Sequence, residues 1–180
     1  IIRYGFLLWA PTYMFEIQKA AIDKTAYKVI AIPLFGIAGA ILSGWASDRY
    51  FQSRRAPVAA LLMGILGFMA IFFYYGVPKD AWLLGFLTLG IIGFCVLGSQ
   101  VILIGAVPMD FGTRKAAGSA AGFIDFFGYL GAGLTGVISG YLAQHFGWEY
   151  AFWFWIISAF ISSALCFGLW TYKPPVGKYL

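Results

Sequence analysis

The sequence is dominated by apolar runs that are too long for the core of a soluble domain. Short polar or proline-containing breaks divide them into six runs. With a helical rise of about 1.5 Å per residue, each of the last five runs would cover roughly 28–40 Å. That length crosses a hydrocarbon core of about 30 Å with some tilt. The first run would cover only about 22 Å, so we expect its beginning to lie upstream in a longer polypeptide. The runs predict helices near residues 1–15, 26–46, 57–75, 81–106, 117–143 and 149–172.

Composition supports the same fold class and excludes several functions. Hydrophobic residues make up 62% of the chain and charged residues only 11%, far outside the range of a soluble domain. The predicted fold is therefore an all-α membrane protein, a bundle of six transmembrane helices in a lipid bilayer. Basic residues form no tract that could follow a phosphate backbone, so we expect no nucleic-acid partner. No nucleophile stands beside a base and no metal-ligand cluster occurs, so we expect neither an enzyme, a metal site nor a cofactor.

The basic residues between the runs predict the orientation of the helices. Cytoplasmic loops of membrane proteins carry an excess of Lys and Arg. The segments 47–56, 107–116 and 173–180 hold seven such residues, and the other side of the bundle holds four, offset by acids. The bias therefore predicts a cytoplasmic C-terminus. The seven residues are Arg49, Arg54, Arg55, Arg114, Lys115, Lys173 and Lys178.

Two charged residues stand inside the apolar runs, where burial of a charge costs at least about 2.5–3.5 kcal/mol. Counted from the ends of their helices, Arg3 and Asp125 each lie about 12 Å from the cytoplasmic side. Tyr129 follows Asp125 by one helical turn, and Gln100 lies about 9 Å from the same side. The four residues are therefore predicted to line one cavity near the midplane. An arginine fork beside a tyrosine hydroxyl is suited to binding a phosphate or a carboxylate.

A purely structural interpretation of these residues also stays open. Arg3 and Asp125 would then form a buried ion pair that fixes helix register without touching a substrate. Gln100 and Tyr129 would merely hydrogen-bond neighbouring helices.

Small residues recur at every fourth position on two of the predicted helices. In lipid, such ridges let helix backbones approach closely. We therefore expect the helices at 26–46 and 117–143 to form tightly packed seams. The ridges consist of Gly36, Ala40 and Gly44 on the first and of Gly128, Ala132, Gly136 and Gly140 on the second.

Several motifs together resemble a known family of membrane transporters. The segment Gly44-x-x-x-Asp48-Arg49, followed by Arg54-Arg55, is similar to the loop signature of the major facilitator superfamily. Within it, the chain resembles the organophosphate:phosphate antiporters along essentially its whole length. The motifs that carry this second resemblance are Arg3-Tyr4-Gly5, Trp9-x-Pro11-Thr12-Tyr13, Asp23-Lys24, Gly44-Trp45-x-Ser47-Asp48 and the block from Lys115 to Gly131.

The resemblance implies a domain organisation and a location. Residues 1–180 would be the C-terminal half of a twelve-helix transporter, containing helices seven to twelve with the first one truncated. Its partner would be an N-terminal six-helix half that rocks against it about a midplane site. The resemblance also implies a multi-pass protein of the bacterial inner (plasma) membrane.

The resemblance further implies an activity and residue roles. An external organophosphate, of the glycerol-3-phosphate or sugar-phosphate class, would enter by alternating access while inorganic phosphate leaves. The family grips phosphate with one arginine from each half, and Arg3 matches the C-terminal one, while Tyr129 matches a tyrosine of the family's site. Gly44, Asp48 and Arg49 would form a conformational latch, in which the aspartate approaches the start of the helix that begins near Ala117.

Departures from the family pattern leave the substrate and the mode of action open. A member of the family has acids at the positions of Leu8 and Pro33 and a glycine at that of Asp125. Two alternatives to exchange therefore stay open. One is a transporter-like membrane sensor of sugar phosphates, and the other is a proton-coupled major facilitator that uses Asp125 to carry another organic anion.

Overall fold

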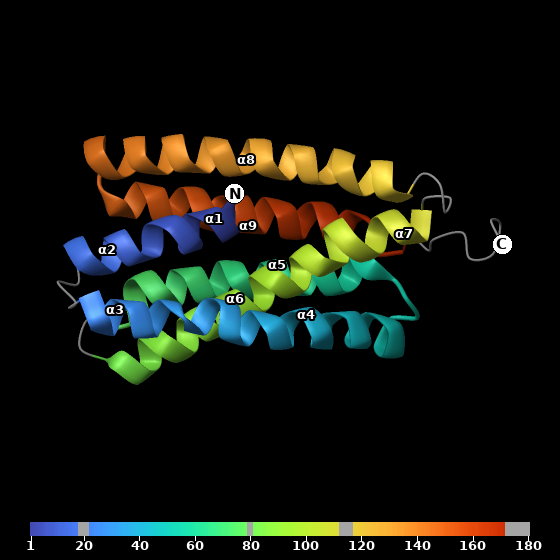
Figure 1. Ribbon diagram of the computed structural model, residues 1–180, viewed down its shortest axis with the longest axis horizontal. Coiled ribbons are helices and arrows are strands. Elements are labelled where there is room, and N and C mark those ends of the chain that lie inside the picture. Colours follow the sequence, from blue (N-terminus) through green and yellow to red (C-terminus); the bar gives the residue numbers. More distant parts are fainter. Residues whose placement is uncertain (18–21, 79–80, 112–116, 172–180) are drawn as a thin grey trace.

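The computed structural model describes residues 1–17, 22–78, 81–111 and 117–171, and within these ranges every regular element is helical. The helices run roughly parallel to the long axis of the molecule (Figure 1). The prediction of an all-α fold is confirmed. The elements are α1 Ile2–Tyr4, the π-helical η1 Gly5–Trp9, α2 Ala10–Glu16, α3 Ile22–Val29, α4 Ala31–Tyr50, α5 Arg55–Ile71, the π-helical η2 Phe72–Gly76, α6 Trp82–Gln100, the π-helical η3 Val101–Ala106, α7 Val107–Phe111, α8 Ala117–His145 and α9 Trp148–Gly168.

Five helices in the described ranges are long and apolar enough to cross a membrane. Each corresponds to one of the last five apolar runs of the sequence, and the first run forms the shorter succession α1, η1 and α2. The protein is therefore an integral membrane protein. The five spans are Thr25–Tyr50, Arg55–Gly76, Trp82–Met109, Ala117–His145 and Trp148–Gly168.

Prolines explain two of the π-helical segments, η1 and η3, and the break before α4. A proline lacks the N–H that bonds to the carbonyl four residues earlier, and its ring clashes with that carbonyl. Pro11 and Pro108 each stand in the first turn of an α segment that directly follows a π-helical one, η1 and η3 respectively. Pro33 stands in the first turn of α4, after the break at Ile30 that ends α3. The wider π turns and the break remove the clash without ending the span.

The loop between α4 and α5 is shorter than the sequence suggested. We expected a loop over 47–56, but α4 continues to Tyr50 and α5 begins at Arg55. The chain reverses within this short loop because Gln52 and Ser53 both adopt positive φ angles, 53° and 59°. Asp48 and Arg49 consequently lie in the last turn of α4 rather than in the loop. The last helix also differs, since α9 ends at Gly168 instead of near residue 172.

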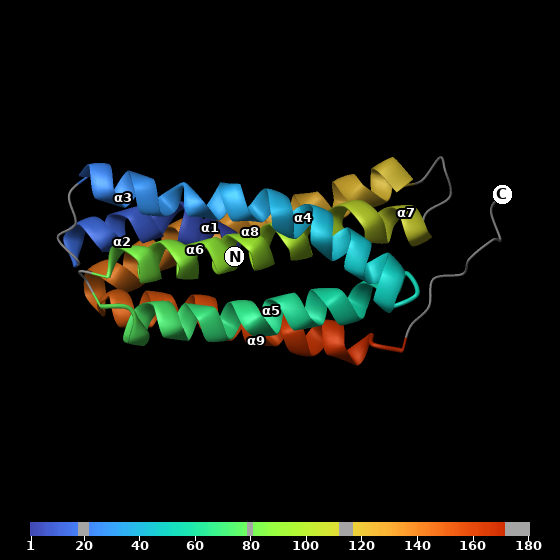
Figure 2. The same cartoon turned by 90° about the horizontal axis from the view of Figure 1, so that it is seen from below.

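The core forms where α5 packs against α6 and α9, and the Phe6 ring of η1 joins it by packing against aromatic residues of α9. Phe6, Leu66, Phe152 and Trp155 are almost completely buried there. α4 packs along α6, and α8 lies along one side of the bundle, in contact with α9 and with the first segments of the chain (Figures 1 and 2). The window of α8 that spans the membrane is only 6% buried, the least of the five spans. Among these five spans, α8 is thus the one that the described residues cover least.

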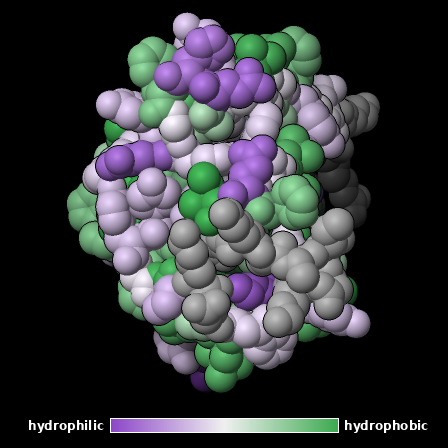
Figure 3. Space-filling model, turned by 90° about the vertical axis from the view of Figure 1, so that its left-hand side faces the viewer, coloured by the Kyte–Doolittle hydropathy of each residue, from purple (hydrophilic) through white to green (hydrophobic). Residues whose placement is uncertain are grey.

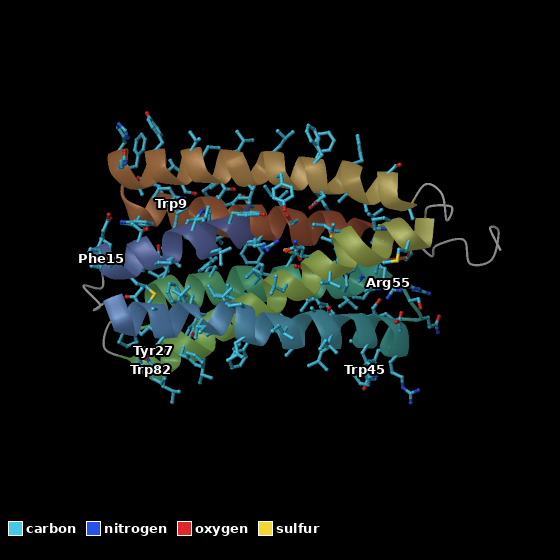
Figure 4. All side chains as sticks on the ribbon, in the orientation of Figure 1. Trp9, Phe15, Tyr27, Trp45, Arg55 and Trp82 are labelled. Carbon is cyan, nitrogen blue, oxygen red and sulfur yellow. The ribbon has the colours of Figure 1, made fainter. Side chains whose placement is uncertain are left out.

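The two ends of the bundle differ in the connections that they carry. The α4–α5 loop, α7 and the end of α9 lie at one end of the bundle. The labelled Arg55 lies near this end in Figure 4. The turns from α5 to α6 and from α8 to α9 lie at the other end, where hydrophilic patches alternate with apolar ones (Figure 3). The loop arginines Arg54 and Arg55 therefore share an end with α7, and the side of the membrane that this end faces stays a prediction. Arg114, Lys115, Lys173 and Lys178 lie outside the described residues.

Candidate functional site

A cavity of about 460 Å³ opens midway along the bundle. Its wall is built by α1, α5, α6, η3, α8 and α9, so it lies on the side of the core that faces α8. All four residues that the sequence predicted to share a cavity line it, although they come from three separate segments of the chain. These residues are Arg3, Gln100, Asp125 and Tyr129.

Arg3 is held at this cavity by a single polar partner. Its Nη1 atom donates a hydrogen bond to Oε1 of Gln100 at 2.5 Å. Its guanidinium carbon lies 5.3 Å from the centroid of the Tyr4 ring. The structure records no further hydrogen bond or ion pair between Arg3 and the described residues. Because a guanidinium carries five N–H donors, most of its donors remain available to a ligand in the cavity.

Asp125 and Tyr129 reach the cavity from α8. They stand one turn apart, which places both on the same face of the helix. Tyr129 packs against Tyr4, with ring centroids 6.3 Å apart and planes inclined by 51°. Its side chain is nevertheless 61% exposed, because α8 lies at the edge of the bundle.

The buried ion pair that the sequence left open is not formed in this structure. Among the described residues, the one ion pair joins Arg55 to Asp48, and Arg3 bonds to Gln100 instead of Asp125. The two opposite charges face the same cavity but remain separate. Arg3 therefore does not need Asp125 to hold its position.

Two of the four residues stand next to π-helical segments. Arg3 lies in α1, just before η1, and Gln100 is the last residue of α6, directly before η3. π-helical turns occur frequently at functional sites, because they widen the helix and redirect the side chains beside them. Pro11 and Pro108 mark both segments in the sequence.

Sequence reasoning missed several lining residues. Tyr4 lies directly beside Arg3, and Ser158 and Ser162 face the cavity from α9. The two serines hydrogen-bond the carbonyls of Phe154 and of Ser158, one turn earlier, at 2.7 and 2.8 Å. The sequence does carry a signal for the two serines. They are hydroxyl residues spaced four apart in an apolar helix, which places them on one helix face.

The expected latch residues lie far from this cavity, at the end of the bundle that carries the α4–α5 loop. Asp48 accepts hydrogen bonds from Arg55 at 2.7 Å and from Ser53 at 3.1 Å, which ties α4 to the start of α5. Arg49 is exposed. A side chain built at Gly44 would meet no described atom within 4 Å, so the close approach expected there is not made within the described ranges. The residues directly before α8, 112–116, lie outside the described residues.

Comparison with known proteins assigns the family. Residues 1–136 match the model of the Major Facilitator Superfamily. The chain belongs to this superfamily. Its relatives there include a glycerol-3-phosphate transporter of Bacillus subtilis, which is 39% identical over 152 residues, covering 84% of this chain and 34% of that protein.

Two further relatives in the superfamily carry different names. A probable hexose phosphate transport protein of Chlamydia trachomatis is 30% identical over 175 residues, which are 94% of this chain and 37% of that protein. The membrane sensor protein UhpC of Escherichia coli is 31% identical over 137 residues, which are 76% of this chain and 30% of that protein. The chain thus spans about a third of the length of the curated relatives that it matches. The superfamily and these relatives support the expectation that the chain is not an enzyme.

Proposed function

We propose that residues 1–180 form the C-terminal six-helix domain of a secondary transporter that carries an organophosphate across the membrane. The phosphate group would bind in the cavity, with Arg3 as its principal ligand from this half. Gln100 would orient the guanidinium, and Tyr129 would donate its hydroxyl to a phosphate oxygen. The transporter relatives, named for glycerol-3-phosphate and for hexose phosphate, support this substrate class.

The availability of the Arg3 donors is the observation that carries the proposal. An arginine at this depth in a membrane is costly unless it is paired or serves a function. Arg3 has one neutral partner, Gln100, among the described residues and stands at a cavity large enough for a small ligand. A phosphate would fit the guanidinium fork with two parallel hydrogen bonds and would neutralise its charge.

The transport mode that we propose is exchange. A six-helix N-terminal half would close the cavity from the open side of α8 and contribute a second arginine, and the two halves would rock about the bound phosphate. External organophosphate would enter as inorganic phosphate leaves. The orientation that we propose has a cytoplasmic C-terminus in a bacterial inner membrane, because the basic residues favour that side. Asp48, with Gly44 and Arg49, would act as the latch at the cytoplasmic end.

Exchange can be tested with the full-length protein in proteoliposomes. Vesicles loaded with unlabelled inorganic phosphate are expected to take up labelled phosphate, and external glycerol 3-phosphate or a hexose phosphate should inhibit this uptake. Empty vesicles of the same lipid and vesicles without internal phosphate serve as controls. Uptake that does not depend on internal phosphate would rule out exchange, and uptake that no phosphate compound inhibits would rule out the substrate class.

A membrane sensor is the second candidate function, supported by the similarity to the Escherichia coli sensor protein. A sensor would bind the phosphate compound at the same cavity but would pass its signal to a partner protein. Saturable binding of labelled phosphate to the purified protein, without exchange in vesicles, would favour the sensor. A requirement for a pH gradient, without counterflow of phosphate, would instead favour the proton-coupled carrier that uses Asp125.

A further inference from the structure

The cavity holds two charges of opposite sign that do not neutralise each other. Arg3 is bonded to Gln100, and Asp125 makes no hydrogen bond or ion pair with any residue that the structure describes. An ionised carboxylate in a membrane-spanning helix is costly when it has no partner. A phosphate bound at Arg3 would not supply that partner, because phosphate and carboxylate repel each other. The second arginine that we propose from the other half would bind the same phosphate, so among the described residues the carboxylate is left without a counter-charge.

The surroundings of Asp125 are aromatic. Tyr4, Phe127 and Tyr129 line the same cavity, and the Tyr4 and Tyr129 rings lie 6.3 Å apart at an inclined angle. The Tyr4 ring also lies 5.3 Å from the guanidinium carbon of Arg3, so the aromatic residues border both charged groups of the cavity. A carboxylate beside aromatic faces is the chemistry that recognises an ammonium group, by charge and by cation–π attraction.

We infer that the substrate of this cavity is a zwitterionic organophosphate, whose phosphate binds at Arg3 and whose ammonium group binds at Asp125. The inference rests on the proposed function and specifies its substrate class. A short aminoalkyl phosphate carries both groups a few bonds apart and is small enough for a cavity of about 460 Å³. Asp125 then discriminates against phosphates whose organic part carries no positive charge.

A matched pair of phosphates tests the inference on the full-length protein. 2-Aminoethyl phosphate and n-propyl phosphate have nearly the same size and differ by an ammonium in place of a methyl group. Both are used to displace labelled inorganic phosphate from the purified protein at pH 7. We expect the aminoethyl compound to displace it at about tenfold lower concentration, as one charge pair in a partly screened site would give.

Two variants then assign the preference to Asp125. Asp125→Asn should bring the two displacement concentrations within about twofold of each other, because the amide keeps the shape and loses the charge. Asp125→Glu should retain the preference. The readout is the ratio between the two compounds within each variant, so a change in phosphate affinity or in protein yield does not affect it.

The outcomes separate this inference from the proposed function. Displacement by both compounds at equal concentrations in the wild-type protein would overturn the inference alone, and so would a preference that survives Asp125→Asn. Failure of the wild-type protein to bind labelled phosphate, or to release it to any organophosphate, would overturn the proposed function and the inference with it.

Discussion

The glycines of the α4–α6 interface and those of α8 have similar spacing but opposite surroundings. A Cβ atom at Gly39 or Gly93 would overlap backbone atoms of the facing helix, at Phe94 and Ile32 respectively. A Cβ atom at Gly133 or Gly136 on α8 would meet no described atom within 4 Å. At the α4–α6 interface the glycines let two backbones touch, whereas the described residues leave space open beside α8 at Gly133 and Gly136.

The contrast shows that a small-residue ridge does not by itself specify its partner. We expected tightly packed seams on both helices, and within the described residues that holds for the Gly36 part of α4. On α8 it holds mainly near Gly140, where an added Cβ atom would lie 3.0 Å from the Trp9 ring. In membranes such ridges serve helix association. The bare part of α8 therefore agrees with the proposal that a second six-helix half packs on it.

The largest effect is expected at the α4–α6 interface. Gly93→Ala places a methyl group against the backbone of Ile32, which cannot move unless the two helices separate. We expect a loss of about 3 kcal/mol in the free energy of unfolding, typical of severe overpacking. The unfolding midpoint of the purified full-length protein in detergent measures it. The matched control is Gly85→Ala on the same helix, where the new methyl would only make ordinary contact, 3.5 Å from Lys28. Equal losses in the two variants would contradict close packing at Gly93.

A smaller loss is expected where α8 is attached to α9. Trp155 is fully buried, and its Nε1 atom donates a hydrogen bond to the buried Oγ atom of Ser139 at 2.8 Å. Trp155→Phe leaves a void and a hydroxyl without its donor, which should cost about 2 kcal/mol in the same unfolding assay. Trp153→Phe is the control, because the Trp153 side chain is 40% exposed and its bond to Tyr75 is longer, at 3.3 Å. An equal loss of unfolding free energy in Trp153→Phe and Trp155→Phe would contradict the role of the Trp155–Ser139 hydrogen bond in attaching α8 to α9.

On the bare face of α8, substitution should have little effect on stability. Gly136→Ala meets no described residue and improves helix propensity, and the proposed second half would move against this face rather than hold its backbone close to it, so we expect a change within about 1 kcal/mol. The unfolding midpoint of the full-length protein again gives the value. A loss as large as that of Gly93→Ala would contradict this expectation. It would mean that residues outside this chain pack on α8 as closely as α6 packs on α4.

The smallest effect on stability is expected at the α4–α5 loop. The ion pair between Asp48 and Arg55 is 2.7 Å long, but the Asp48 side chain is 59% exposed, so Asp48→Asn should cost only about 0.5 kcal/mol. Stability and phosphate exchange are measured on the same preparation. If Asp48 acts as the proposed latch, exchange falls although the unfolding midpoint hardly changes. Unaltered exchange would leave Asp48 as a loop-forming residue alone.

From the sequence, the depth of a side chain along the bundle could be predicted well. The direction in which the side chain points around its helix could not. The rise per residue places Arg3, Gln100, Asp125 and Tyr129 at similar depth, and the structure brings all four to one cavity. Which of them bond to each other depends on the rotation and packing of the helices, so the sequence could not distinguish a bond from Arg3 to Asp125 from one to Gln100. The position of Asp48 on α4 was missed for another reason. It depends on positive φ angles at Gln52 and Ser53, where no glycine marks the turn.

Equilibrium binding of labelled inorganic phosphate to the full-length protein tests the role of Arg3 most directly. Arg3→Lys keeps the positive charge but loses the planar fork, and Arg54→Lys makes the same change outside the cavity. The account predicts that Arg3→Lys raises the Kd for phosphate by at least about tenfold, while Arg54→Lys leaves it within about twofold of the wild-type value. An unchanged Kd in Arg3→Lys, in a protein that still binds phosphate, would contradict the assignment of Arg3 as the phosphate ligand.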